Sequence, residues 1–143
     1  MSNKVLNILL VEDDEVDVMN VQRSFKRNNV VNPLYTAGNG LEALDMLRGV
    51  NGAPPAMPEE RRIILLDLNM PKMNGIEFLR ELRADPKLQK IPVVVLTTSD
   101  EDRDKVAAYE FNVAGYILKP VTLTSFIETM AALNHYWMLS ELP

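Results

Sequence analysis

The sequence predicts an α/β fold in which helices cover both faces of a parallel sheet. Short apolar runs alternate with longer amphipathic stretches five times along the 143 residues, which is the pattern of a β-α repeat. The apolar runs are continuous rather than alternating, as is typical of strands buried on both faces. Because crossovers between parallel strands are right-handed, we expect a three-layer sandwich with a five-stranded parallel sheet and five helices.

The apolar runs are the expected strands, since they are short and most are rich in Val, Ile and Leu. The second run, which begins after Pro33, is the weakest of the five, and the fourth has a proline near its start. In chain order the expected strands are Val5–Val11, Leu34–Ala37, Ile63–Leu66, Ile91–Leu96 and Gly115–Leu118.

The amphipathic stretches are the expected helices, because their apolar residues recur on one helical face. Gly49 and Pro86 end the second and third helices, and Asp100 is a suitable N-cap for the fourth. In chain order the expected helices are Asp13–Asn28, Leu41–Leu47, Gly75–Ala84, Glu101–Phe111 and Leu123–Trp137. The stretch from Val50 to Arg62 contains three prolines and fits neither period, so we expect a long exposed loop there.

Composition restricts the class of protein. A hydrophobic content of 47% and a charged content of 24% are those of an ordinary globular domain. A net charge of -5 gives no basic surface for nucleic acid or for an anionic membrane. Cysteine is absent, which excludes disulfides and fits a reducing compartment. Since no stretch approaches the roughly 20 apolar residues of a membrane span, we expect a soluble, cytoplasmic protein of one domain.

Polar side chains follow four of the five expected strands, at the point where each strand ends. They are Glu12, Asp13 and Asp14 after the first strand, Asp67 after the third, Thr97 and Thr98 after the fourth, and Lys119 after the fifth. Ligands of open parallel sheets bind at the carboxyl ends of the strands. A single acid at such a position is most often a turn or helix-capping residue, but four matching strand ends together indicate a functional site.

These residue types together form a receptacle for a phosphoryl group. Carboxylates held side by side repel one another unless a cation lies between them, and their hard oxygens select Mg²⁺ or a similar ion. A lysine adds a compact positive charge, and a threonine adds a hydroxyl donor. Phosphoryl transfer needs mainly positioning and charge neutralisation, and no general base is needed when the nucleophile is itself a carboxylate.

Four motifs at the strand ends carry a family resemblance: ILLVEDD at residues 8–14, LLDLNMPKMNG at 65–75, VVLTTSD at 94–100 and GYILKP at 115–120. On these motifs the sequence resembles the receiver domain of two-component response regulators over nearly its whole length. The spacing from Asp67 to Thr97 and from Thr97 to Lys119 also matches that family. The resemblance implies a flavodoxin-like sheet whose strands, numbered along the chain, lie in the order 2-1-3-4-5.

The resemblance also implies a phosphoacceptor and a metal site. Asp67 would be the phosphoacceptor, which attacks a phosphohistidine on a sensor histidine kinase. Asp13 would ligate Mg²⁺ directly, Glu12 would act through water, and the main-chain carbonyl of Asn69 would complete the protein ligands together with Asp67. Mn²⁺ would be able to replace Mg²⁺. For Asp14, the N-cap of the following helix is the better interpretation.

Three further positions match the switch of the family. Thr97 would donate a hydrogen bond to the phosphoryl group, and Lys119 would pair with it. Tyr116 would be the switch aromatic, rotating into the space that Thr97 leaves; its alternative role is that of an ordinary strand residue at the rim. Phosphorylation would then shift a two-state equilibrium, reported by the face that the last two helices and the strand between them form.

Two features bear on domain organisation and partners. The sequence ends at Pro143 without an output domain, so we expect a single receiver domain over residues 1–143, with its core at about 5–137. The sequence resembles the standalone regulators that partner phytochrome-type histidine kinases in its 50–62 loop, in the segments VNPLYTAGNGLEALDMLRG at 31–49 and LRADPKLQKIPVVVLTTSD at 82–100, and in the aromatic tail NHYWMLSELP. The 50–62 loop itself is either inert or a partner contact. The aromatic tail around Trp137 is either a homodimer contact or a cap on the sheet edge.

Three other interpretations compete with the receiver. A phosphatase of the haloacid dehalogenase type carries a second aspartate two residues after its nucleophile, whereas this sequence has Asn69 there. A receiver-like scaffold that never takes a phosphoryl group is disfavoured, because all the required side chains are present. A dinucleotide-binding domain is disfavoured because no G-x-G-x-x-G follows the first strand. The single histidine, His135, cannot form a multi-histidine metal site.

Overall fold

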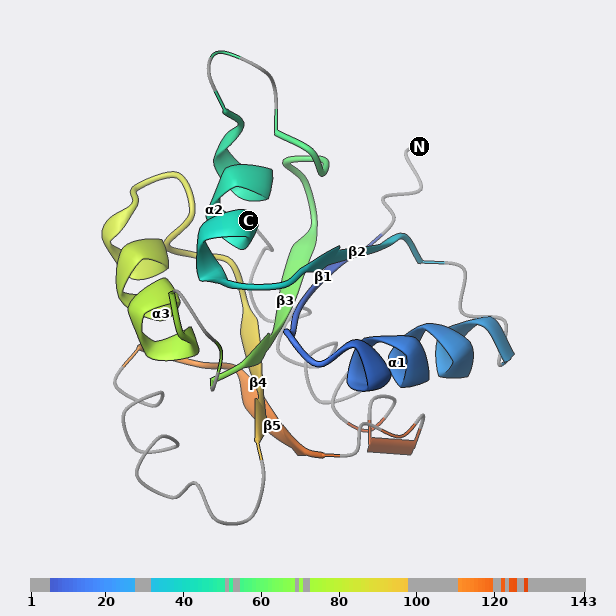
Figure 1. Cartoon of the computed structure of the whole chain (residues 1–143). Coiled ribbons are helices and arrows are strands. Elements are labelled where there is room, and N and C mark those ends of the chain that lie inside the picture. Colours follow the sequence, from blue (N-terminus) through green and yellow to red (C-terminus); the bar gives the residue numbers. More distant parts are fainter. Residues whose placement is uncertain are drawn as a thin grey trace.

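The computed structural model describes residues 6–27, 32–50, 52, 55–68, 70, 73–97, 111–119, 122, 124, 125 and 128, with the backbone alone for residues 97 and 118. Five parallel strands form one sheet (Figure 1) in the order β2-β1-β3-β4-β5, which confirms the expected α/β fold and strand order. The strands are β1 (Asn7–Val11), β2 (Leu34–Ala37), β3 (Arg62–Asp67), β4 (Val93–Thr97) and β5 (Gly115–Leu118).

Helices cover both faces of the sheet, as the continuous apolar strands predicted. The described helices are α1 (Glu15–Arg27), α2 (Gly40–Arg48) and α3 (Gly75–Ala84). Figure 1 shows α2 and α3 on one face and α1 on the other. The two helices predicted at 101–111 and 123–137 lie largely outside the described residues. Within the described part of the chain, no helix has the length and apolar character that a membrane span requires.

Successive residues of the central strands pack against opposite helical layers. On the α2–α3 face, Leu9, Ile64 and Val95 belong to one buried cluster. On the α1 face, Ile8 and Leu65 belong to a second cluster with residues of α1. Because both faces are buried, the central strands are apolar at every internal position, and their polar residues lie at the strand ends.

Side-chain caps fix where the helices begin. Asn74 starts α3 with a capping box, in which its side chain accepts the Glu77 N–H and the Glu77 side chain accepts the Asn74 N–H. Asn39 caps α2 in a similar position. The Asp14 carboxylate accepts the backbone N–H of Val16 at 2.9 Å, which supports the capping role expected for this acid. As a result α1 begins at Glu15 rather than at Asp13.

Two glycines allow the loop after β3 to approach its neighbours closely. A Cβ atom at position 75 would lie 2.5 Å from the Cα atom of Leu68 and 2.8 Å from the carbonyl oxygen of Asp67. A Cβ atom at position 40 would lie 2.8 Å from the carbonyl oxygen of Met73. No side chain larger than hydrogen fits at either position without moving backbone. The start of α3 is therefore held tightly against the end of β3, and Met73, just before α3, is held against the start of α2.

The loop before β3 is less exposed than its composition predicted. Met57 is only 2% exposed and belongs to the core cluster on the α2–α3 face. The neighbouring Ala56 donates its backbone N–H to the carbonyl oxygen of Met46 at 3.0 Å. The expectation of a wholly exposed loop was therefore wrong at this point, because one apolar side chain in a proline-rich stretch is enough to anchor it in the core.

Arg83, near the end of α3, joins three parts of the chain through main-chain carbonyls. Its guanidinium donates to Gln89 O at 2.9 Å and to Ile91 O at 2.9 Å, in the connection from α3 to β4. It also donates to Phe111 O at 2.6 Å and to Asn112 O at 3.3 Å, just before β5. A planar group with five donors suits this geometry, whereas a lysine ammonium does not. Arg83 therefore fastens the approach to β5 onto α3.

We predict that Arg83→Met lowers the free energy of unfolding by about 2–4 kcal/mol, because several carbonyls lose a charged hydrogen-bond donor. Urea denaturation monitored by circular dichroism measures the change. Arg80→Met is the matched control, since Arg80 lies on the exposed side of the same helix. Equal stabilities of the two variants would show that the carbonyl contacts of Arg83 contribute nothing.

Candidate functional site

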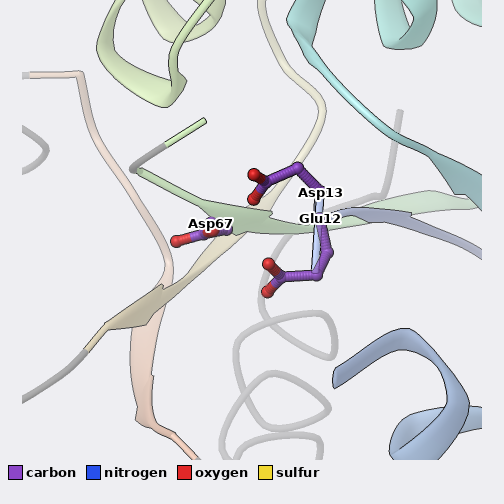
Figure 2. A group of neighbouring side chains, drawn as sticks. All are labelled: Glu12, Asp13 and Asp67. Atoms are coloured by element: carbon purple, nitrogen blue, oxygen red, sulfur yellow. The ribbon is translucent and has the colours of Figure 1, made fainter. Parts of the chain in front are cut away.

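Three carboxylates meet at the carboxyl edge of the sheet. Glu12 and Asp13 directly follow β1, and Asp67 is the last residue of the neighbouring strand β3. One carboxylate oxygen from each of these residues lies within 4.8 Å of the other two. Figure 2 shows the three side chains gathered at the ends of the two strands. The structure therefore brings together three of the four acids that the strand-end pattern singled out, while Asp14 caps α1 instead.

The three acids of this trio differ in their exposure to solvent. Glu12 is 3% exposed and Asp67 is 5% exposed, whereas Asp13 is exposed. Buried carboxylates need a compensating charge or proton, because burial strongly penalises the ionised form. The trio thus has a dry side at Glu12 and Asp67 and an open side at Asp13, through which a hydrated cation can enter.

Lys119, which directly follows β5, supplies part of the compensating charge. Its Nζ atom lies 2.8 Å from Glu12 Oε1 and 3.5 Å from Asp67 Oδ2. It also lies 3.2 Å from Asp17 Oδ2 on α1. The predicted lysine is therefore in the site, and it joins two of the predicted acids to one that was not predicted. The sequence did not predict Asp17 as a site residue, because acids in the first turn of a helix are common for electrostatic reasons alone.

The charges of the site shift the protonation of Glu12 and Lys119. Burial raises the pKa of the Glu12 carboxyl to about 7; the contact with Lys119 lowers it, and the neighbouring Asp67 adds to the rise. Burial lowers the pKa of Lys119, but its contact with Glu12 and the charges of Asp67 and Glu12 outweigh this effect and raise it. One lysine therefore does not neutralise the negative charge of the acids fully. The remaining negative charge favours binding of a further cation.

The donor set fits a hard divalent cation. The trio offers carboxylate oxygens only, which is the ligand type that Mg²⁺ and Mn²⁺ prefer. Such an ion would supply positive charge that Lys119 alone does not provide. The arrangement is the acidic metal site typical of Mg²⁺-binding receivers.

The remaining predicted site residues are only partly described. Asn69 lies outside the described residues, as do Thr98 and the side chain of Thr97. Tyr116 lies on β5 opposite Val95 of β4, and it is half-buried against the core on the α2–α3 face. The tail from residue 136 onward, including Trp137, and His135 also lie outside the described residues.

The fold and the acid–lysine site define a phosphoryl-accepting receiver of the doubly wound α/β type. The family model of the response regulator receiver domain matches residues 8–131. The chain belongs to this family, whose members are signalling proteins phosphorylated on an aspartate rather than true enzymes, and a histidine kinase is therefore its partner. The phosphatase and dinucleotide-binding alternatives raised by the sequence are accordingly wrong.

Relatives and solved structures resemble the chain over nearly its full length. The response regulator Rcp1 of Synechocystis sp. is 37% identical over 137 residues, which span 96% of this chain and 92% of Rcp1. Its Mn²⁺-bound structure has a TM-score of 0.71 at 36% identity, with 96% of this chain and 99% of the other covered. A two-component response regulator from Legionella pneumophila has a TM-score of 0.77 at 41% identity, with 91% and 98% covered. The bacteriophytochrome response regulator AtBRR has a TM-score of 0.77 at 33% identity, with 96% and 99% covered.

We predict that the metal-free protein loses stability as the pH rises from about 4.5 to about 7. In this range the folded state retains the Glu12 proton while the unfolded chain has released it, so the folded state binds more protons and its stability falls with pH. Urea midpoints measured across the range in the presence of EDTA test this. Glu12→Gln removes the titrating group and flattens the slope.

Glu15→Gln is the control, because Glu15 is an exposed acid on the first turn of α1 and its replacement keeps the slope. A slope that is the same in Glu12→Gln and in the original protein would contradict the assignment of the shifted proton to Glu12.

Proposed function

We propose that Asp67 is the phosphoacceptor of this receiver, with Glu12 and Asp13 as further ligands of Mg²⁺ and Lys119 as the partner of the phosphoryl group. The observation that carries the proposal is the position of Asp67. It is the one acid of the trio that ends a central strand, and it is buried beside two other carboxylates and 3.5 Å from a lysine.

The reaction needs no other nucleophile. An oxygen of the Asp67 carboxylate forms a bond to phosphorus, the P–N bond of the phosphohistidine breaks, and the imidazole leaves with the electron pair of that bond. Hydrolysis later cleaves the acyl phosphate, with water as the nucleophile, and restores the carboxylate. Bound Mg²⁺ would neutralise charge on the transferred group, while Lys119 pairs with a phosphoryl oxygen.

The other two acids of the trio are less suited to the nucleophilic role. Asp13 is exposed and lies on the open side of the site, where a hydrated cation enters. Glu12 is occupied by its 2.8 Å ion pair with Lys119. The Asn69 carbonyl as a metal ligand and the Thr97 hydroxyl as a donor to the phosphoryl group complete the proposal, and both rest on the family resemblance.

We further propose that the partner kinase is of the phytochrome type and that the protein acts in the cytoplasm. The support for the kinase type is similarity along nearly the whole chain to a protein described as a bacteriophytochrome response regulator. That relation extends beyond the receiver core, since 96% of this chain is covered.

We predict that incubation with acetyl phosphate and Mg²⁺ adds one phosphoryl group per chain and that Asp67→Asn abolishes this addition. In the reaction the Asp67 carboxylate displaces acetate from phosphorus. Intact-protein mass spectrometry measures the product, and EDTA is expected to prevent its formation. Asp45→Asn is the matched control, since Asp45 is an exposed aspartate on α2. Phosphorylation that survives in Asp67→Asn would contradict the assignment.

We also propose a phosphorylation-dependent homodimer, formed by the face of the last two predicted helices with β5 and by the C-terminal tail. The dimer is supported by the position of β5 as an edge strand of the described sheet and by Tyr116 on that strand, which is half-buried. The expected result is a mass that rises with protein concentration in light scattering, more so with beryllofluoride and less so in Tyr116→Ala. A monomer mass at every concentration, with and without beryllofluoride, would refute the dimer.

A further inference from the structure

The ammonium group of Lys119 contacts three carboxylates, which come from the residue after β1, from α1 and from the end of β3. Its Nζ atom lies 2.8 Å from Glu12 Oε1, 3.2 Å from Asp17 Oδ2 and 3.5 Å from Asp67 Oδ2. The contact with Asp17 is also a hydrogen bond. Asp67, the proposed phosphoacceptor, is therefore the most distant of the three carboxylates. The ammonium group lies closer to Asp17 on α1 than to Asp67.

Asp17 is well placed to hold the lysine in this position. It lies in the first turn of α1, and its backbone N–H donates to the capping carboxylate of Asp14 at 3.3 Å. The backbone of Asp17 is thus fixed relative to the end of β1. Its side chain is 32% exposed, compared with 1% for Glu12, so Asp17 is the acid whose removal disturbs the buried site least.

The flexible side chain of Lys119 allows its ammonium group to move. A small cavity of about 10 Å³ lies beside it, with Glu12 and Asp17 on its polar side and Leu10 and Leu96 among its apolar walls. The lysine side chain is a flexible four-carbon stem with three donors. Asp67 does not line this cavity, so the shift toward Asp67 rests on rotation within the lysine stem, whose ammonium group already lies 3.5 Å from Asp67 Oδ2.

We propose that Asp17 is a positioning residue that holds Lys119 on the α1 side of the site and thereby opposes its contact with phosphorylated Asp67. The inference rests on the proposed function of Asp67. A phosphoryl group carries up to about two negative charges and draws the ammonium group away from Asp17 when it forms. The Asp17–Lys119 contact thus favours the unphosphorylated state, and its loss is part of the free-energy cost of phosphorylation.

The experiment compares the affinity of the Mg²⁺-loaded protein for beryllofluoride, a phosphoryl mimic, before and after Asp17→Asn. Because a partly exposed ion pair contributes modestly, we expect roughly 1.5- to 5-fold tighter binding. Glu15→Gln is the matched control: Glu15 lies in the same turn of α1 and is exposed. It removes an equal charge without touching the hydrogen bond to Lys119, so its effect measures the long-range charge alone.

A crystal structure of unphosphorylated Asp17→Asn gives a second readout that does not depend on phosphorylation. We expect the distance from Lys119 Nζ to Asp67 Oδ2 to be shorter than in the original protein, with the contact to Glu12 kept. A purely structural role of Asp17 in α1 would leave this distance unchanged.

The outcomes separate this inference from the proposed function. Binding in Asp17→Asn that is equal to that of Glu15→Gln, or weaker, would overturn the role of Asp17. If the original protein binds no beryllofluoride and takes no phosphoryl group from acetyl phosphate, the proposed function of Asp67 is wrong. In that case the position of Lys119 in the crystal structure alone decides whether Asp17 holds the lysine.

Discussion

The repulsion among three carboxylates at one edge of the sheet is the constraint on which the rest of the site depends. Glu12 and Asp67 are almost completely buried, and a pair of buried acids without compensation would favour either protonation or separation. Lys119 reaches both of them from the end of β5. The fold can keep the acids together only because β1, β3 and β5 end at the same edge. The strand order thus has an electrostatic consequence as well as a topological one.

The incomplete compensation is what makes the site responsive. A cluster neutralised fully by its own side chains would have little affinity for a metal ion or for a phosphoryl group. Here one lysine faces three acids at 2.8–3.5 Å, and the exposed Asp13 adds a further negative charge. The site therefore gains from any added cation, and the cation in turn makes an added phosphoryl dianion tolerable. Binding of the cation and addition of the phosphoryl group are thus coupled, because both depend on the charges of the same three acids and Lys119.

Most of the fold could be predicted from local pattern. Continuous apolar runs such as Ile63–Leu66 predict strands with both faces covered, and the acids that end them identify the functional edge. The observed strand boundaries differ from the predicted ones by one or two residues. For example, the fourth strand was expected to start at Ile91, but β4 begins at Val93. The preceding Pro92 has no N–H to donate to the neighbouring strand.

The contacts that the sequence did not reveal all depend on tertiary structure. Asp17 lies in an acid-rich first turn, so its sequence context did not distinguish a site residue from an ordinary helix-end acid. Met57 is a single apolar residue among prolines, and Arg83 is one of several charged residues on α3. Each has its role through partners that lie far away in the sequence, such as Lys119 for Asp17 and Phe111 for Arg83. Periodicity describes which face a residue occupies and does not describe what it meets there.

The close packing at Gly40 and Gly75 has a consequence for how proteins of this kind can diversify. Backbone atoms lie within 3 Å of where a methyl group would be at both positions, and at position 75 one of them is the carbonyl oxygen of Asp67. A larger side chain at position 75 would therefore displace the backbone of the proposed nucleophile. The loop before β3 lies at the opposite end of this strand, where Met57 is buried in the core and its neighbours Pro58 and Glu59 are exposed. Evolution, or a designer inserting a recognition sequence, can therefore alter the amino end of β3 while the chemistry at its carboxyl end stays intact.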